Sequence, residues 1–264
     1  MRSNGYFKLA IAAIQTRLAY RTAFWMRFAD TSIHVYLLNV FWSAVYVGRD
    51  NVDGITLSAM ITYSLLATLQ ANLVEMNIHM EVANKIRQGS VVIDLTRPYG
   101  FLRAYLAADI GGFILNCFFV AVIGFFFSLW LPLRLPDSPW IVLLYLFSIL
   151  LSFSVRFMIN CLMALAAFWI LEIHGLNMIV NMVSRFLAGG FVPLWLMPPA
   201  VQRLSNFLPF QSIIYLPVAI YIGKITNAEI YWALWQQIIW IGALAMIVNM
   251  VWKVTERKIV VQGG

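Results

Sequence analysis

The segment Glu81–Arg103, with the sequence EVANKIRQGSVVIDLTRPYGFLR, is the longest stretch between apolar segments that is too polar to enter lipid. Its basic residues are Lys85, Arg87, Arg97 and Arg103. Because the cytoplasmic loops of membrane proteins carry an excess of Lys and Arg, we place this segment in the cytoplasm. This assignment sets the orientation of every membrane span before and after it.

A short apolar run lies inside this basic loop. The run and its enclosed acid are Val91, Val92, Ile93, Asp94 and Leu95. Gly89 can end the preceding helix because glycine accepts the left-handed cap conformation, and Pro98 keeps Arg97 out of a helix. We predict a short helix, a turn, an apolar tip and a rigid exit. An exposed apolar tip needs a surface that covers it. That surface is either a cytosolic partner or the protein's own membrane domain.

The composition of the chain is that of a polytopic membrane protein. Of its 264 residues, 62% are hydrophobic and 11% are charged, and the mean hydropathy is +0.82. A soluble domain has roughly 45–50% apolar and 25% charged residues. The net charge of +7 follows from where the basic residues stand relative to the membrane and does not indicate a nucleic-acid partner. The two cysteines, Cys117 and Cys161, lie in apolar segments and give no metal-binding or disulfide spacing.

We predict an all-α integral membrane fold in two parts. Residues 1–27 form a cytoplasmic N-terminus, and residues 28–264 form the transmembrane domain. Residues 6–25 have an apolar stripe at helical spacing, flanked by Arg17 and Arg21, which predicts an amphipathic helix along the membrane interface. Six transmembrane helices are predicted at about residues 28–48, 55–79, 105–131, 140–171, 176–190 and 230–252.

The segment 201–223 is apolar enough to span a membrane, but Pro209 and Pro217 interrupt it. The basic residues decide between six and seven spans, because only six place both termini in the cytoplasm. The basic residues then inside are Arg2, Lys8, Arg17, Arg21, Arg27, Lys85, Arg87, Arg97, Arg103, Lys253, Arg257 and Lys258. Those outside are Arg49, Arg134, Arg203 and Lys224. We therefore predict that 201–223 forms two re-entrant half-helices in the outer leaflet.

Catalytic motifs are absent from the sequence, as is the Walker A pattern GxxxxGK[ST], so we expect no enzyme activity and no cofactor in this chain. Arg156 and Arg185 lie inside apolar segments, where a charge normally faces a cavity or a partner. Glu75 and His79 are four residues apart, which places them on one face of a continuous helix. These four residues are the candidates for a substrate path; structural ion pairs and polar pairs at helix ends are the alternative roles.

The run Ile86–Arg87–Gln88–Gly89–Ser90, followed by Ile93–Asp94–Leu95 and Arg97–Pro98, resembles the cytoplasmic loop of ABC-2 type permeases. The subfamily it resembles reads roughly I-R-x-G-x-[IV]-x-x-[DY]-L-x-R-P at this loop. The order of the N-terminal helix, six spans and outer re-entrant helices is also similar to that family.

The resemblance implies the permease subunit of an exporter in the plasma or inner membrane. Such permeases dimerise with the same or a similar permease, are surrounded by lipid, and dock a separate cytosolic ATPase that binds ATP and Mg²⁺. By this analogy, 91–95 enters a cleft of the ATPase. The alternatives are a membrane-embedded enzyme that acts on lipid-linked substrates and a non-transporting assembly or sensor subunit.

The predicted topology places Ser90 in the cytoplasm and Asp50, Asp137 and Arg203 outside. In intact cells, a single cysteine at position 137 should react with an impermeant thiol reagent, and a cysteine at position 90 should not. Labelling at position 90 but not at position 137 would overturn this layout.

Overall fold

The fold is built almost entirely of helices. The computed structural model describes residues 3–19, 21–96, 100–170, 173–226 and 228–262. The longer helices are α1 (Ser3–Ala19), α2 (Arg21–Val45), α3 (Leu57–Leu73), α4 (Ile78–Arg87), α6 (Phe101–Ser128), α7 (Pro139–Ala166), α8 (Ile173–Leu187) and α11 (Ala228–Gln262). The shorter elements are β1 (Asn51–Val52), β2 (Ile55–Thr56), α5 (Val91–Thr96), η1 (Leu194–Leu196), α9 (Pro199–Phe207), η2 (Pro209–Ser212) and α10 (Tyr215–Tyr221).

Four stretches of the described chain are long and apolar enough to cross a membrane: Leu57–Arg87, which joins α3 and α4, Phe101–Ser128, Pro139–Ala166 and Ala228–Arg257. The protein is therefore an all-α membrane protein. The other two predicted spans correspond to α2 and α8. The 15 residues of α8 extend about 22 Å, which is less than the thickness of a bilayer's hydrocarbon core. The number of six spans stays a prediction.

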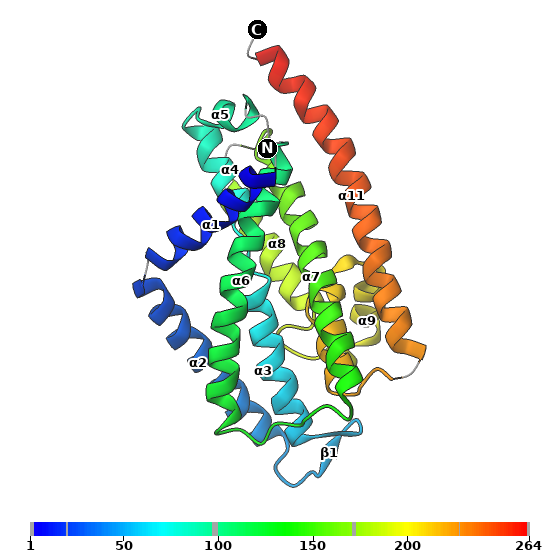
Figure 1. Cartoon of the computed structure of the whole chain (residues 1–264). Helices are drawn as coiled ribbons and strands as arrows, with labels where there is room; N and C mark the ends of the chain where they lie inside the picture. Colours follow the sequence, from blue (N-terminus) through cyan, green and yellow to red (C-terminus); the bar gives the residue numbers. More distant parts are fainter. Residues whose placement is uncertain (1–2, 20, 97–99, 171–172, 227, 263–264) are drawn as a thin grey trace.

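The two ends of the molecule differ in structure. The start of α1, all of α5 and the end of α11 lie together at one end, and the β1–β2 hairpin lies at the other (Figure 1). Asp53 and Gly54 have positive φ angles of 53° and 75°, the conformation that a two-residue hairpin turn requires. Thr56 follows directly and caps α3, since its hydroxyl accepts a hydrogen bond from the amide of Ala59.

The N-terminal helix is shorter than predicted. α1 ends at Ala19 and α2 begins at Arg21, so the last part of the predicted helix 6–25 belongs to α2. α1 lies across α6 at two glycines (Figure 1): a Cβ atom at Gly111 would overlap the carbonyl group of Ala10, and one at Gly112 would overlap the guanidinium of Arg17. Glycines allow this close approach of two helix backbones, which fixes α1 on α6 independently of α2.

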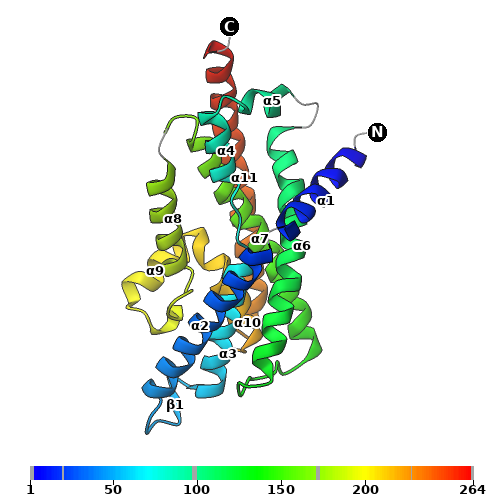
Figure 2. The ribbon, with the colours of Figure 1, turned by 90° about the vertical axis from the view of Figure 1, so that its left-hand side faces the viewer.

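The predicted span 55–79 is not one continuous helix. α3 ends at Leu73, residues 74–77 have no regular structure, and α4 begins at Ile78. In the view of Figure 2, α6 and α8 lie on opposite sides of the line formed by α3 and α4. The break between α3 and α4 therefore lies between α6 on one side and α8 on the other.

The proline-containing segment before α11 is bonded to two long helices. Gln237 of α11 is buried, and its side-chain amide donates to the carbonyl of Ser212 in η2 at 2.8 Å. The side-chain oxygen of Gln237 accepts from Ser148 of α7 at 2.9 Å. The hydroxyl of Ser152, also on α7, donates to the same Ser212 carbonyl at 2.7 Å. These bonds join α7, η2 and α11.

Substitution of Gly111 by Ala should separate α1 from α6, because the added Cβ meets backbone atoms that cannot rotate away. We expect a loss of about 1–3 kcal/mol in unfolding free energy, read as a lower thermal midpoint of the purified protein. Gly242 of α11 is the matched control, since a Cβ there meets nothing within 4 Å. Gly242→Ala should leave the midpoint unchanged or raise it. Equal effects of the two substitutions would contradict close packing at Gly111.

Candidate functional site

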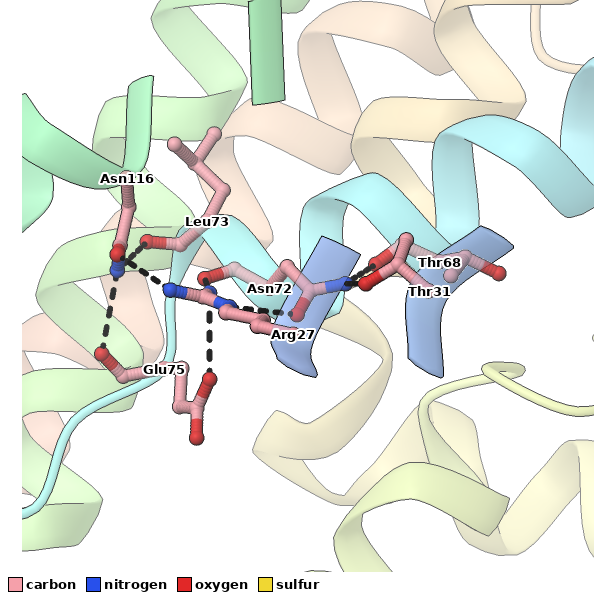
Figure 3. A network of polar contacts seen from close by, with 7 residues as sticks. All are labelled: Arg27, Thr31, Thr68, Asn72, Leu73, Glu75 and Asn116. Carbon is pink, nitrogen blue, oxygen red and sulfur yellow. Dashed lines mark hydrogen bonds and ion pairs between the residues drawn. The ribbon is translucent and has the colours of Figure 1, made fainter. Parts of the chain in front are cut away.

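The end of α3 is held by an arginine from α2. The guanidinium of Arg27 donates to the side-chain oxygen of Asn72 at 3.1 Å and to its backbone carbonyl (Figure 3). It also donates to the side-chain oxygen of Asn116 at 2.9 Å and lies 3.2 Å from the carboxylate of Glu75. The last carbonyl groups of a helix have no partner within the helix. A positively charged donor is favourable there because of the helix dipole.

Asn116 of α6 completes the cap. Its side-chain amide donates to the carbonyl of Leu73 at 3.1 Å (Figure 3). On the other side, the amide of Asn72 donates to the hydroxyl of Thr31 in α2 at 3.3 Å. The guanidinium carbon of Arg27 also lies 4.5 Å from the centre of the Phe119 ring. Side chains from α2 and α6 thus satisfy the backbone that the break leaves unpaired.

A cavity of about 320 Å³ lies beside the break. It brings together three of the four predicted substrate-path residues, Glu75, Arg156 and Arg185. Much of the remaining wall is apolar and includes Met76, Met182, Phe191, Ile213 and Ile214. A smaller cavity of about 150 Å³ adjoins it, shares the wall residues Ala71, Arg185, Phe191 and Ile214, and adds Asp30 and His34.

Arg156 of α7 contacts neutral groups. Its guanidinium donates to the side-chain oxygen of Asn181 in α8 at 2.6 Å, and the amide of Asn181 donates to Asn177 at 2.6 Å. Among the described residues, no carboxylate lies within ion-pair distance of Arg156. Arg156 thus has one amide as its hydrogen-bond partner among the described residues, which leaves most of its N–H donors for another partner.

His79, the fourth predicted residue, does not line the cavity. Its side chain is buried, with Nδ1 2.8 Å from the side-chain oxygen of Asn160, whose amide donates to the carbonyl of Arg156 at 3.0 Å. The prediction that Glu75 and His79 share a helix face is wrong, because the break at 74–77 separates them. Glu75 turns to Arg27, whereas His79 joins α4 to α7.

The loop that contains α5 is fixed to the neighbouring helices by Lys85. Lys85 of α4 lies 2.7 Å from Glu81 and 2.7 Å from Asp94 of α5, and donates to the hydroxyl of Tyr105 in α6 at 3.2 Å. The Tyr105 hydroxyl donates to the same carboxylate oxygen of Asp94 at 3.0 Å. The Asp94 side chain is only 11% exposed, so this cluster holds α5 against α4 and α6.

The apolar tip forms the short helix α5, and its side chains divide between two directions. Val91 is buried and Leu95 is half-buried against the protein's own core, whereas Val92 and Ile93 are 57% and 59% exposed. Gly89 has a φ of 70°, which confirms the predicted left-handed turn. Arg87 is exposed at the end of α4, and the predicted exit residues Arg97 and Pro98 lie outside the described residues.

The comparisons with known proteins agree with this architecture. The chain matches the family described as ABC-2 family transporter protein over residues 33–263. The chain belongs to this family. The ABC-2 match includes the break, the larger cavity and the loop with α5. A comparison with curated protein sequences finds no match.

Sequence reasoning missed Arg27, Asn116 and Asn181 as functional residues of this ABC-2 chain. It treated Arg27 only as one of the cytoplasmic charges and did not consider the two asparagines. The available signal was an asparagine inside an apolar span, since a buried amide in lipid requires a partner. The partners themselves lie 45 and 89 residues from Arg27, so local patterns could not identify them.

Replacement of Arg27 by Met in the ABC-2 chain removes the donors at the end of α3 and keeps the apolar length of the side chain. We expect a loss of about 2–3 kcal/mol in unfolding free energy, because the charge-assisted hydrogen bonds to Asn72 and Asn116 disappear and their side-chain oxygens lose this donor. The unfolding free energy of Arg27→Lys should lie between those of the wild type and Arg27→Met, since an ammonium keeps the charge but lacks the planar set of donors of a guanidinium. The measurement is thermal unfolding in detergent.

The control for Arg27 is Arg49→Met, because Arg49 is exposed beside the β1–β2 hairpin and should change stability by less than about 0.5 kcal/mol. If Arg27→Lys unfolded at the wild-type temperature, the positive charge alone would maintain the break, and the hydrogen bonds of the guanidinium to Asn72 and Asn116 would not be needed.

Proposed function

We propose that this protein is the permease subunit of an ATP-driven exporter. The observation that carries the proposal is that the family match over 33–263 includes a charged cavity in the membrane domain and a loop with two exposed apolar residues. In this proposal ATP and Mg²⁺ bind to a separate cytosolic ATPase. The permease pairs with a second copy of itself or with a similar chain in the cell membrane.

The proposed orientation places α5 and both termini in the cytoplasm, with α9 and α10 as re-entrant helices at the outer side. The common end of the molecule that holds α5, the start of α1 and the end of α11 supports this arrangement (Figure 1). The ATPase would then contact Val92 and Ile93, the two apolar tip residues that the membrane domain leaves uncovered.

The coupling route follows from the contacts of α4. At one end Lys85 fixes α4 to α5 through Asp94, and near its other end His79 fixes α4 to α7 through Asn160. A push on α5 by the closing ATPase would therefore move α4 about the break at residues 74–77. Because Arg156 lies one helical turn from Asn160 on α7, this movement would reach the larger cavity. Alternating access requires such a two-state link between the ATPase and the cavity.

Substitution of Ile93 by Asp should abolish retention of the ATPase. Burial of an isoleucine contributes about 1.5–3 kcal/mol, and an unpaired carboxylate in the interface costs several more. Together they predict at least about a hundredfold weaker docking. The measurement is affinity purification of the tagged chain from its native membranes, followed by identification of a subunit with Walker motifs and by assay of ATP hydrolysis.

Gln88→Asp is the matched control, because Gln88 is an exposed polar residue of the same loop and the substitution adds the same charge. It should retain the ATPase. If the Ile93→Asp chain kept its ATPase at the wild-type ratio, α5 would not be the docking element. If the wild-type chain retained no ATPase, the exporter proposal itself would fail.

A further inference from the structure

The larger cavity contains more positive than negative charge that is open to a ligand. Arg156 and Arg185 both line it. Among the residues that the structure describes, Glu75 is the one carboxylate in its wall, and it is paired with Arg27. Asp30 lines only the smaller cavity. The two guanidinium groups therefore face the larger cavity without a carboxylate of their own among the described residues.

The partners of these two arginines leave donors unused. Arg156 uses one guanidinium nitrogen for Asn181, and Arg185 makes no ion pair with a described carboxylate. A guanidinium presents five N–H donors in a planar fork that matches a carboxylate or phosphate group. A charge at membrane depth is normally compensated by a partner or by water in a cavity.

The rest of the wall suits an apolar body. Met76, Met182, Phe191, Ile213 and Ile214 surround the same space. A volume of about 320 Å³ falls within the range of sites for small molecules. The methionine side chains can adapt to bodies of different shape. The wall thus combines two guanidinium groups with an adaptable apolar surface.

We propose that the larger cavity binds an amphipathic anion, with its carboxylate, phosphate or sulfate group on Arg156 and Arg185 and its apolar body against the methionines and Ile213–Ile214. The proposal that the anion binds stands on the cavity itself. The proposal that the anion is the transported cargo rests on the proposed exporter function. Two kinds of anion fit this description: a phospholipid of the surrounding membrane, and a free organic acid that enters the cavity from the membrane.

The test uses the purified full-length chain in phosphatidylcholine nanodiscs without an ATPase. Radiolabelled dodecyl phosphate and dodecyltrimethylammonium are titrated under the same conditions. We expect dodecyl phosphate to bind about tenfold more tightly or better, because a charge-assisted hydrogen bond to an anion contributes about 1.5–3 kcal/mol. Equal binding of the two probes, or tighter binding of the cation, would overturn the proposal.

Three single substitutions locate the site. Arg156→Gln and Arg185→Gln should each weaken dodecyl phosphate binding about tenfold or more and leave dodecyltrimethylammonium binding unchanged or stronger. Arg203→Gln is the matched control, since Arg203 is an exposed residue of α9 that does not line the cavity. If Arg156→Gln fails to fold, as judged by its thermal midpoint, Arg185→Gln alone decides. Wild-type affinity in the folded cavity variants would refute the assignment.

A second set of nanodiscs that contain phosphatidylglycerol separates the two kinds of anion. If a phospholipid is the occupant, phosphatidylglycerol should suppress dodecyl phosphate binding and remain with the wild-type chain after detergent washing. It should be lost from Arg185→Gln. If a free acid is the occupant, phosphatidylglycerol should leave dodecyl phosphate binding unchanged. Either result supports an anion site.

The outcomes also separate this proposal from that of the exporter. Ile93→Asp should leave dodecyl phosphate binding intact, because the tip of α5 is not part of the cavity wall. If the wild-type chain binds the anion but retains no ATPase, the anion site is supported and the exporter proposal fails. If the wild-type chain retains its ATPase but does not prefer the anion, the anion site fails and the exporter proposal stands.

Discussion

The hydrogen bonds of Arg27 and Asn116 to the end of α3 are the constraint on which the rest of the arrangement depends. A helix that stops inside a membrane-spanning segment leaves its last carbonyl groups without partners in the helix, and they need donors from elsewhere. Here one guanidinium and one amide, from helices on either side in sequence, supply the missing donors. These bonds stabilise the interrupted course of the chain at residues 74–77.

That interruption creates both functional features of the membrane domain. It gives Glu75, the one carboxylate that lines the larger cavity among the described residues, an ion-pair partner in Arg27. It also makes α4 a separate element, bonded to α5 through Lys85 and to α7 through His79. A continuous helix would have tied the loop rigidly to the whole of α3.

The sequence predicted what depends on local pattern and missed what depends on distant partners. Apolar length predicted α6, α7 and α11, and glycine chemistry predicted the turn at Gly89. The break was missed because residues 70–79 contain no glycine or proline, so helical periodicity extended across it. The polar residues Gln70, Asn72, Glu75 and Asn77 in that stretch were the local sign. The position of Arg156 and Arg185 in apolar segments marked them as candidates to face a cavity or a partner, and both line the larger cavity. It did not identify the amide of Asn181 that bonds to Arg156.

The buried amide of Gln237 has a consequence for how the larger cavity can change shape. Because it bonds η2 to α7 and α11, the residues that directly follow η2, Ile213 and Ile214, belong to a unit of three elements. These two isoleucines also form part of the cavity wall. Other residues of the wall, Asn181, Met182 and Arg185, belong to α8, which bonds to α7 through Asn181. A small displacement of α8 would therefore change the shape of the cavity and leave the hydrogen bonds of Gln237 to η2 and α7 in place.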